Sequence, residues 1–307
     1  MPAISEDFPS LLEPGLRKIF TEQYNQMPEM RPMLYNAQSS DTSYEKDSSE
    51  GAFGNMDPFT GTVQYDDIYE GYPVTYTHQE FAKGFKIERR LFDDDLYGVI
   101  AKKPKGLAMS ASRTKEMYGA QVFNTAFAGS GTIQVGNTVV LNNSEGLSLC
   151  NTAHTSKAPK QATQSNSGTS ALSATSVEAT RILMSQFLDD RGNKISVQSD
   201  LLLVPRNLEE TAWEIVSSKG KVDTAENNSN FHFGKYKLAV WDYLSSGKSW
   251  FMIDENMMKM FLLWYDRVPL EFNQDKSFDT YIAKYSAYER YAFGWSDWRF
   301  LYGQKVN

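Results

Sequence analysis

The sequence of 307 residues predicts an α+β protein. Apolar side chains recur with helical spacing within residues 89–128, 175–192 and 207–220. Residues 58–88 and 271–307 instead alternate between apolar and polar side chains, as strands do. A chain of this length is long enough to bury a substantial core.

The first 45 residues predict an arm more than a part of a core. Leu11 to Met27 has the amphipathic pattern of a short helix, and Pro28 and Pro32 stop that helix from continuing. The stretch NAQSSDTSYEKDSSEGAFG that follows is polar and rich in turn residues, which is typical of an exposed segment.

Residues 58–88 predict a long, tyrosine-rich β-hairpin. Side chains alternate up to Gly71, which marks the turn, and alternate again through Val74 and Tyr76. Neither face offers much apolar surface, and an isolated two-stranded ribbon is marginal in water. We therefore expect the ribbon to lie on something else, for which another copy of the chain is one candidate.

The middle of the chain predicts a helix followed by strands. Residues 89–128 have helical spacing with an interruption at Pro104 and Gly106. Glycine-punctuated strands follow at residues 129–150, and a polar loop, KAPKQATQSNSGTSALS, comes next.

Capped helices mark the second half of the chain. One helix opens with the capping box Thr175-x-x-Glu178, and another with Asn207-x-x-Glu210. Between them, SDLLLVP predicts a short buried strand. KYKLAVWDYL and WFMID predict two strands of a hairpin or meander, and the aromatic-rich residues 271–307 predict a closing strand.

Composition excludes several classes of protein. A net charge of −7 is not that of a basic nucleic-acid-binding protein. One cysteine rules out an internal disulfide framework, and with only three histidines the chain has too few ligands for a common zinc pattern. No signal peptide pattern is present, and every apolar run is far shorter than the ~20 residues that span a bilayer. We expect a soluble protein of a reducing cytoplasm.

Cys150 and His154 stand four residues apart in GLSLCNTAHTS and raise the question of thiol catalysis. A thiol nucleophile needs a histidine within hydrogen-bond reach and a third group that orients the ring. The local signatures of cysteine proteases are absent, and Cys150 ends an apolar strand pattern. We expect Cys150 to pack in the core and His154 to anchor a loop. A Cys–His hydrolase remains the alternative.

The other candidate motifs favour structural roles. SSGKS lacks the phosphate-loop glycine five residues before Gly247, where Asp242 stands. Asp93–Asp95 point in different directions on a helix, so a solvated face is the expectation. His78 and His232 have no visible partners in the sequence. The sequence therefore predicts no catalytic, cofactor-binding or metal-binding residue, and no cofactor.

The aromatic C-terminus is a candidate platform for stacking nucleic-acid bases, because Arg290 and Arg299 interleave with tyrosine and tryptophan. Asp279, Glu289 and Asp297 dilute that positive charge. A sheet packed on the chain's own core or on a neighbouring subunit is the favoured interpretation, since buried tyrosine and tryptophan usually serve that purpose.

The order of these segments resembles the major capsid proteins of tailed bacteriophages, which have the Hong Kong-97-type fold, and most closely the major head subunit of Mu-like phages. The stretches that carry the resemblance are EGLSLCNTAHTS, SVEATRILMSQFLDDRGNKI with SDLLLVPRNLEETAWEIVSS, VWDYLSSGKSWFMIDEN and FGWSDWRFLYG. Their order and spacing cover nearly the whole chain, and no single motif is strongly specific.

The resemblance implies a layout of domains. Residues 1–45 would be the N-terminal arm and 46–88 the extended E-loop. Residues 89–175 would form the P-domain with its long spine helix, 176–270 the A-domain, and 271–307 the C-terminal strand of the P-domain. The resemblance also implies that the E-loop lies across the P-domain of a neighbour, and that A-domains meet around five- and sixfold axes.

The implied function is a non-enzymatic major capsid protein that self-assembles into pentamers and hexamers of an icosahedral head around double-stranded DNA. The implied partners are copies of itself, portal, scaffolding and decoration proteins, and DNA bound without sequence specificity. Its place would be the virion, after assembly in the host cytoplasm. Because the chain begins at the arm, we expect a separate scaffolding protein, and we expect no Lys–Asn crosslink. An encapsulin-like compartment shell is the alternative.

Overall fold

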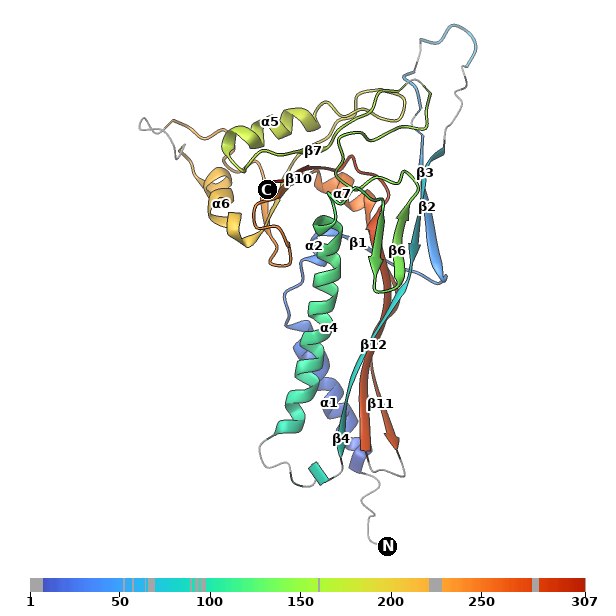
Figure 1. The fold of residues 1–307 in the computed structure, drawn as a ribbon, viewed down its shortest axis with the longest axis vertical. Coiled ribbons are helices and arrows are strands. Elements are labelled where there is room, and N and C mark those ends of the chain that lie inside the picture. The colour runs from blue at the N-terminus through green and yellow to red at the C-terminus, as the bar shows by residue number, and fades with distance from the viewer. Residues whose placement is uncertain are drawn as a thin grey trace.

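The computed structural model of the chain describes residues 8–51, 53–56, 58–63, 65, 70–88, 90–91, 94, 98–159, 161–220, 228–277 and 282–306. Figure 1 shows a broad body, which holds α5, α6 and a small sheet, and a long limb that descends from it. A ribbon of two strands stands beside the body and carries a segment that projects past it. Every helix within these described residues is too short or too polar to span a lipid bilayer.

The limb is built on a four-stranded sheet, called here the long sheet. Its strand order is β1 (Asn36–Ser39), β11 (Leu262–Ser277), β12 (Ile282–Trp295) and β4 (Gln79–Glu88), and only β1 and β11 run parallel. The helices α1 (Phe8–Asn25) and α4 (Val99–Asn124) pack on one face of this sheet. Leu16 of α1, Leu107 of α4 and Tyr285 of β12 belong to the buried cluster between the helices and the sheet. Alternate side chains of β12 are buried there, as expected for a sheet covered on one face.

The body contains a five-stranded sheet with a tryptophan-rich core. Its order is β7 (Ser167–Gly168), β13 (Leu301–Gln304), β10 (Trp250–Ile253), β8 (Leu201–Val204) and β9 (Lys237–Val240). The three central strands are buried throughout, which explains why LLLV and WFMI are continuous apolar runs without alternation. The described residues also form the helices α2 (Arg31–Leu34), α5 (Ala174–Met184), η1 (Arg206–Leu208), α6 (Glu209–Ser217) and α7 (Glu255–Phe261).

A third sheet, called here the ribbon sheet, has the order β2 (Tyr44–Glu50), β3 (Glu70–Thr77), β6 (Thr138–Asn143) and β5 (Thr132–Val135). The predicted hairpin of residues 58–88 is wrong, because Gly71 lies inside β3 and β3 pairs with β2. The strand after it, β4, pairs with β12 of the long sheet. Phe81 and Phe85 account for this, since they stack on Tyr291 and Tyr285 of β12.

Several predicted elements are confirmed, although their caps differ. The helix of residues 11–27 is α1, the strands of 129–150 are β5 and β6, and the capped helices are α5 and α6. The capping box of α5 is formed by Ser173 and Ser176, while Glu178 bonds Arg181 instead. Asn207 lies within η1 and caps no helix.

The predicted interruption at Pro104 is wrong, because α4 runs continuously from Val99 to Asn124. Proline removes only one backbone hydrogen bond here, near the start of the helix. Pro104 is itself buried, and Leu107 and Ala108 after it join the core of the limb. This packing outweighs the lost bond.

The predicted hairpin between the strands at 237–240 and 250–253 is also wrong. β8 lies between β9 and β10 in the sheet, and β9 runs parallel to β8. Helix α6 connects β8 to β9, and a parallel pair needs such a crossover. The closing region forms two strands in different sheets, with β12 in the long sheet and β13 in the body.

Candidate functional site

Cys150 is a packing residue in the core of the body. Its side chain is 3 % exposed, and a Cβ placed on Gly303 of β13 would lie 2.5 Å from its sulfur. Burial raises the pKa of the Cys150 thiol well above its ordinary value. The thiolate that nucleophilic chemistry needs is therefore disfavoured at this position.

His154 anchors the loop that follows Cys150. Its Nδ1 lies 3.1 Å from Glu145 Oε2, and its Nε2 lies 3.1 Å from Asn166 Oδ1. The ring stacks on Trp298, with 4.4 Å between the ring centroids. Asn166 Nδ2 in turn donates to the backbone oxygen of Leu149. The predicted anchoring role is confirmed, and both nitrogens of the ring face these partners instead of the thiol.

The other two histidines have partners that the sequence did not reveal. His78 Nε2 lies 3.0 Å from Ser40 Oγ, and His232 Nδ1 lies 3.4 Å from the Tyr236 hydroxyl. The partner of His78 comes from a segment 38 residues earlier in the chain. No local spacing signal could have found that pair.

The remaining motifs form ordinary turns where they are described. In SSGKS, the hydroxyl of Ser246 accepts the backbone N–H of Ser249 just before β10 begins. Of Asp93–Asp95, only Asp94 is among the described residues, and its N–H donates to the Arg90 oxygen. Among the described residues, no three His, Cys, Asp or Glu side chains gather as metal ligands would.

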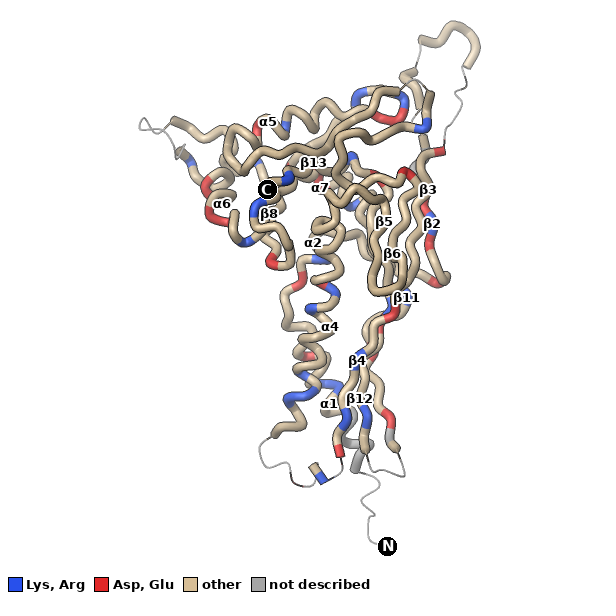
Figure 2. Tube along the Cα trace, viewed as in Figure 1, with Lys and Arg blue, Asp and Glu red and all other residues tan. Residues whose placement is uncertain are grey.

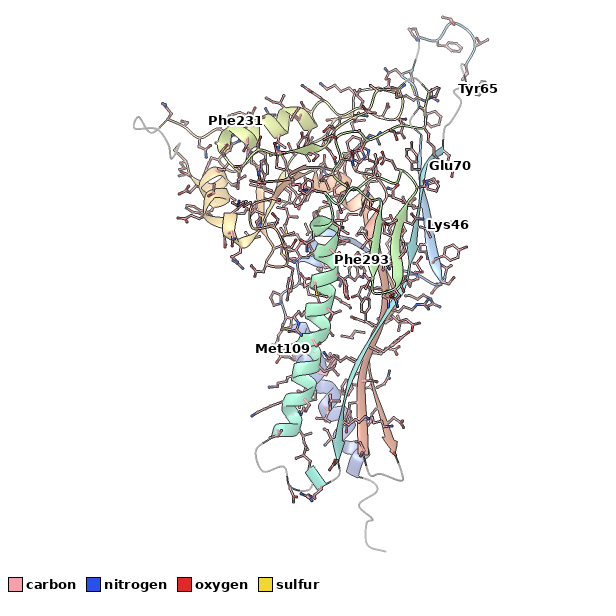
Figure 3. The ribbon with its side chains drawn as sticks, viewed as in Figure 1. Lys46, Tyr65, Glu70, Met109, Phe231 and Phe293 are labelled. Atoms are coloured by element: carbon pink, nitrogen blue, oxygen red, sulfur yellow. The ribbon has the colours of Figure 1, made fainter. Side chains whose placement is uncertain are left out.

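The tip segment, residues 51–69 between β2 and β3, exposes large apolar side chains. Figure 3 places Tyr65 far from the body, whereas Phe293 lies inside the molecule. The exposed fractions are 66 % for Phe53, 101 % for Met56, 76 % for Phe59, 65 % for Val63 and 92 % for Tyr65. No Lys or Arg occurs between residues 51 and 82, while Asp57, Asp66, Asp67 and Glu70 are acidic. Solitary exposed apolar residues are normal, but a gathered set marks an interaction surface.

The outer face of α4 has the opposite charge. Lys102, Lys103, Lys105 and Arg113 are exposed on it, and none has an ion-pair partner among the described residues. Figure 2 shows Lys and Arg positions, in blue, along the lower part of the limb. Met109 lies among them, on the side of α4 away from the sheet (Figure 3). This face combines positive charge with exposed methionine.

A third exposed apolar surface lies on the body. Ile182 and Leu183 of α5 are exposed, as are Phe231 and Phe233 of the segment that packs beside it. Lys235 Nζ lies 3.0 Å from the centroid of the Phe231 ring, so the surface also carries a cation. The molecule thus exposes apolar side chains at the tip segment, on α4 and on the body.

A family model described as "Phage capsid protein" matches residues 71–303, which is more than half of the chain. The chain belongs to the phage capsid protein family. This capsid protein is therefore a subunit of a phage capsid shell. A search of curated proteins returned no match.

Solved structures share the fold of this capsid protein. The "Bacteriophage JBD30 capsid" matches with a TM-score of 0.54 and 13 % identity, covering 72 % of this chain and 92 % of that one. "Mycobacterium phage Patience" matches with a TM-score of 0.57 and 11 % identity, covering 95 % of this chain and 86 % of that one. The "virus-like particle from Pyrococcus furiosus" matches with a TM-score of 0.52 and 8 % identity, covering 95 % of this chain and 98 % of that one.

These likenesses and the family match confirm the predicted α+β, Hong Kong-97-type capsid fold. The Mu-like subtype stays a prediction. The spacing of apolar residues did not reveal the tip segment or the outer face of α4 as exposed surfaces. Their charge does signal them in the sequence, because the tip segment contains no Lys or Arg, whereas α4 contains several.

Proposed function

We propose that this capsid protein assembles into pentamers and hexamers of an icosahedral head that encloses double-stranded DNA. The observation that carries the proposal is the set of exposed apolar side chains on the tip segment. A projecting segment that cannot bury Phe53, Met56 and Phe59 within its own chain needs a neighbour to cover them. An acidic chain is suited to enclosing DNA without binding it tightly, because fewer cations contact phosphates.

Each region of the chain has a role in this proposal. Residues 1–45 are the N-terminal arm, and 46–88 are the E-loop, whose last strand continues into the long sheet. The expectation that the arm lies outside the core is wrong, because Leu16 of α1 packs in the core of the limb and Leu34 and Tyr35 are buried in the main core. Residues 89–175 form the P-domain with α4 as its spine helix. Of residues 271–307, β12 closes that domain, whereas β13 joins the sheet of the body. Residues 176–270 form the A-domain, which meets its copies around the five- and sixfold axes, except that β11 from Leu262 onward lies in the long sheet of the limb.

The E-loop lies across the P-domain of a neighbouring subunit in this proposal. Its tip segment is apolar and acidic, and the outer face of α4 is basic and carries Met109. Surfaces of opposite charge that both expose apolar side chains are complementary, and the charges favour correct encounter. Because each copy offers both surfaces, the same pairing can repeat from subunit to subunit, and it gives a closed ring when the rotation between neighbours is one fifth or one sixth of a turn.

The protein is non-enzymatic in this proposal, and it needs no cofactor. Two observations support a non-enzymatic role over the Cys–His hydrolase alternative. The pKa of the Cys150 thiol is raised, and both ring nitrogens of His154 contact Glu145 and Asn166 instead of the thiol. The further partners are portal, scaffolding and decoration proteins and the packaged DNA, and assembly takes place in the host cytoplasm. The virion head is the final location.

Replacing Phe53, Met56 and Phe59 together by serine tests this role of the tip segment. Each buried large apolar side chain contributes about 1.5–3 kcal/mol, so losing three should reduce the yield of shells more than about tenfold. The free subunit of the triple variant should unfold at the same midpoint urea concentration as the wild-type subunit, because these side chains are exposed within the subunit. Sedimentation separates shells from free subunits.

Met260→Ser provides a matched control, because Met260 is also 65 % exposed but lies on α7 in the body. It should assemble like the wild type. Normal shells from the folded triple variant would contradict the proposed contact. Nucleic acid extracted from purified particles separates the proposed head from a compartment shell, which would hold protein cargo instead.

A further inference from the structure

The ribbon sheet and the long sheet meet at a junction where the chain crosses from one to the other. His78 is the single residue between β3 and β4, which belong to different sheets. Residues 40–43 make the second crossing, from β1 to β2. Gln79, the residue after His78, pairs with Tyr291 of β12, and Tyr291 pairs on its other side with Asp266 of β11. The register between β11 and β12 shifts directly after Asp266, at the same level as His78. A register shift at this level bends the paired strands, and both chain crossings lie beside it, so this junction is called here the hinge.

Side chains bond the two crossing segments to each other. Ser40 Oγ lies 3.0 Å from His78 Nε2, and the Ser40 hydroxyl donates to Glu45 Oε1 at 2.6 Å. The hydroxyl of Thr42 donates to the same oxygen at 2.8 Å. Ser40 and His78 are only 4 % and 5 % exposed, so their bond lies away from water, whereas Thr42 at the other end of the cluster is exposed.

These bonds determine which nitrogen of His78 carries the proton. Hydrogen bonds from Ser40 and Thr42 lower the pKa of Glu45, so Glu45 is a carboxylate and can only accept. The Ser40 proton therefore points toward Glu45, and the Ser40 oxygen accepts from His78 Nε2–H. The neutral ring is left with a bare Nδ1, which is buried and has no hydrogen-bond partner among the described residues.

The surroundings of His78 oppose a second proton. Burial is the largest influence and lowers the pKa of His78 from its ordinary value of 6.5. Arg290 of β12 and Arg267 of β11 oppose the proton as well, while Glu45 of β2 and Asp266 of β11 favour it. A protonated ring would also bury an Nδ1–H group without an acceptor, which is costly unless water reaches it.

We propose that His78 is a pH-sensitive hinge residue: the neutral ring closes the junction between the ribbon sheet and the long sheet, and the protonated ring releases it. The contribution to stability is complete above pH 6.5 and is lost as the pH falls below that value, because the folded state binds its proton less readily than the open state. Since β2 and β3 carry the tip segment, releasing the hinge removes one of the contacts that fix its angle to the limb, while Tyr76 of β3 still packs on Tyr265 of β11. This inference concerns the single subunit and does not depend on shell assembly.

Hydrogen exchange of the full-length, unassembled protein tests the hinge at about pH 7.5 and about pH 5.5, after correction for the intrinsic pH dependence of exchange. Peptides from residues 36–50 and 70–80 should lose protection at the lower pH. Because pH 5.5 is one unit below the ordinary histidine pKa, protection from exchange can fall by at most about tenfold. Peptides from the five-stranded sheet should keep their protection.

His78→Gln is the informative variant, because its amide nitrogen replaces Nε2–H as a donor to Ser40 but gains no proton. It should keep full protection of the junction at both pH values. His232→Gln is a matched control, since His232 is also buried and its pKa is also lowered by burial, but it lies in the body. This control should lose protection at the junction as the wild type does.

An equal loss of protection in His78→Gln and in the wild type would overturn the proposal, as would a wild type that shows no loss. Nuclear magnetic resonance of the wild type with ¹⁵N-labelled histidine gives a second test that needs no variant, because the chain has only three histidines. We expect His78 to carry its proton on Nε2 at neutral pH and to titrate below 6.5. A proton on Nδ1, or titration at or above that value, would overturn the proposal.

Discussion

At the scale of single residues, Cys150 and His154 show how neighbours in sequence can serve different parts of a core. The Cys150 sulfur faces the backbone of Gly303 on β13, where no larger residue would fit. His154 turns the other way and joins Glu145, Asn166 and Trp298. Both residues therefore hold the start of the loop against the closing region of the chain.

Replacing Cys150 by alanine should lower the free energy of unfolding by about 0.5–1.5 kcal/mol, as expected for deleting one buried apolar atom. Cys150→Ser should cost more, about 1–3 kcal/mol, because it buries a hydroxyl in an apolar site. Urea denaturation of the unassembled subunit measures both values. A serine variant that is more stable than the alanine variant would contradict the packing role.

The role of His154 could be anticipated from its position after a strand, but its partners could not. Glu145 lies nine residues before it and Asn166 twelve residues after it, and neither spacing corresponds to a regular element. Trp298 comes from the far end of the chain. Such contacts follow from tertiary packing, which a single sequence does not display.

At the scale of elements, a buried ion pair connects α4 to β12. Lys115 Nζ lies 3.1 Å from Glu289 Oε2, and both side chains are almost completely buried. Beside it, Glu116 accepts the backbone N–H groups of Met30 and Arg31 and the indole N–H of Trp241. These consecutive residues of α4 fix the helix between the long sheet, the N-terminal segment and the body.

Lys115→Met should lower the free energy of unfolding by about 3–5 kcal/mol, because it leaves the Glu289 carboxyl buried without its cation. Adding Glu289→Met should recover most of that loss, since a pair of apolar side chains leaves no unpaired charge. Denaturant unfolding of the two single variants and the double variant measures the coupling. A double variant as unstable as the sum of the single variants would contradict the pairing.

The sequence predicted elements better than it predicted their partners. Helical spacing located α1, α5 and α6, and continuous apolar runs located β8 and β10. The pairing of β4 with β12 could not be predicted, because their aromatic contacts join residues about two hundred positions apart. β11 was missed, since Pro269 and several charges interrupt its alternation. Partner strands depend on long-range packing, whereas helical spacing is a local property.

At the scale of the whole molecule, the fold leaves three apolar surfaces exposed around one well-packed core. The tip segment projects furthest, and Figure 1 shows that it extends beyond the body. The order of segments along the chain was sufficient to predict the capsid fold, because that order reflects the entire architecture and not one motif. The surfaces proposed to join subunits were visible in the sequence only as charge asymmetry between the tip segment and α4.

Electron microscopy of the purified protein, alone and together with the scaffolding protein proposed for it, decides whether the protein forms a shell. We predict closed shells whose surface shows rings of five and six subunits. The tip segment of each subunit should lie over the P-domain of its neighbour in the reconstructed density. A monodisperse monomer that forms neither shells nor rings under any of these conditions would contradict the account.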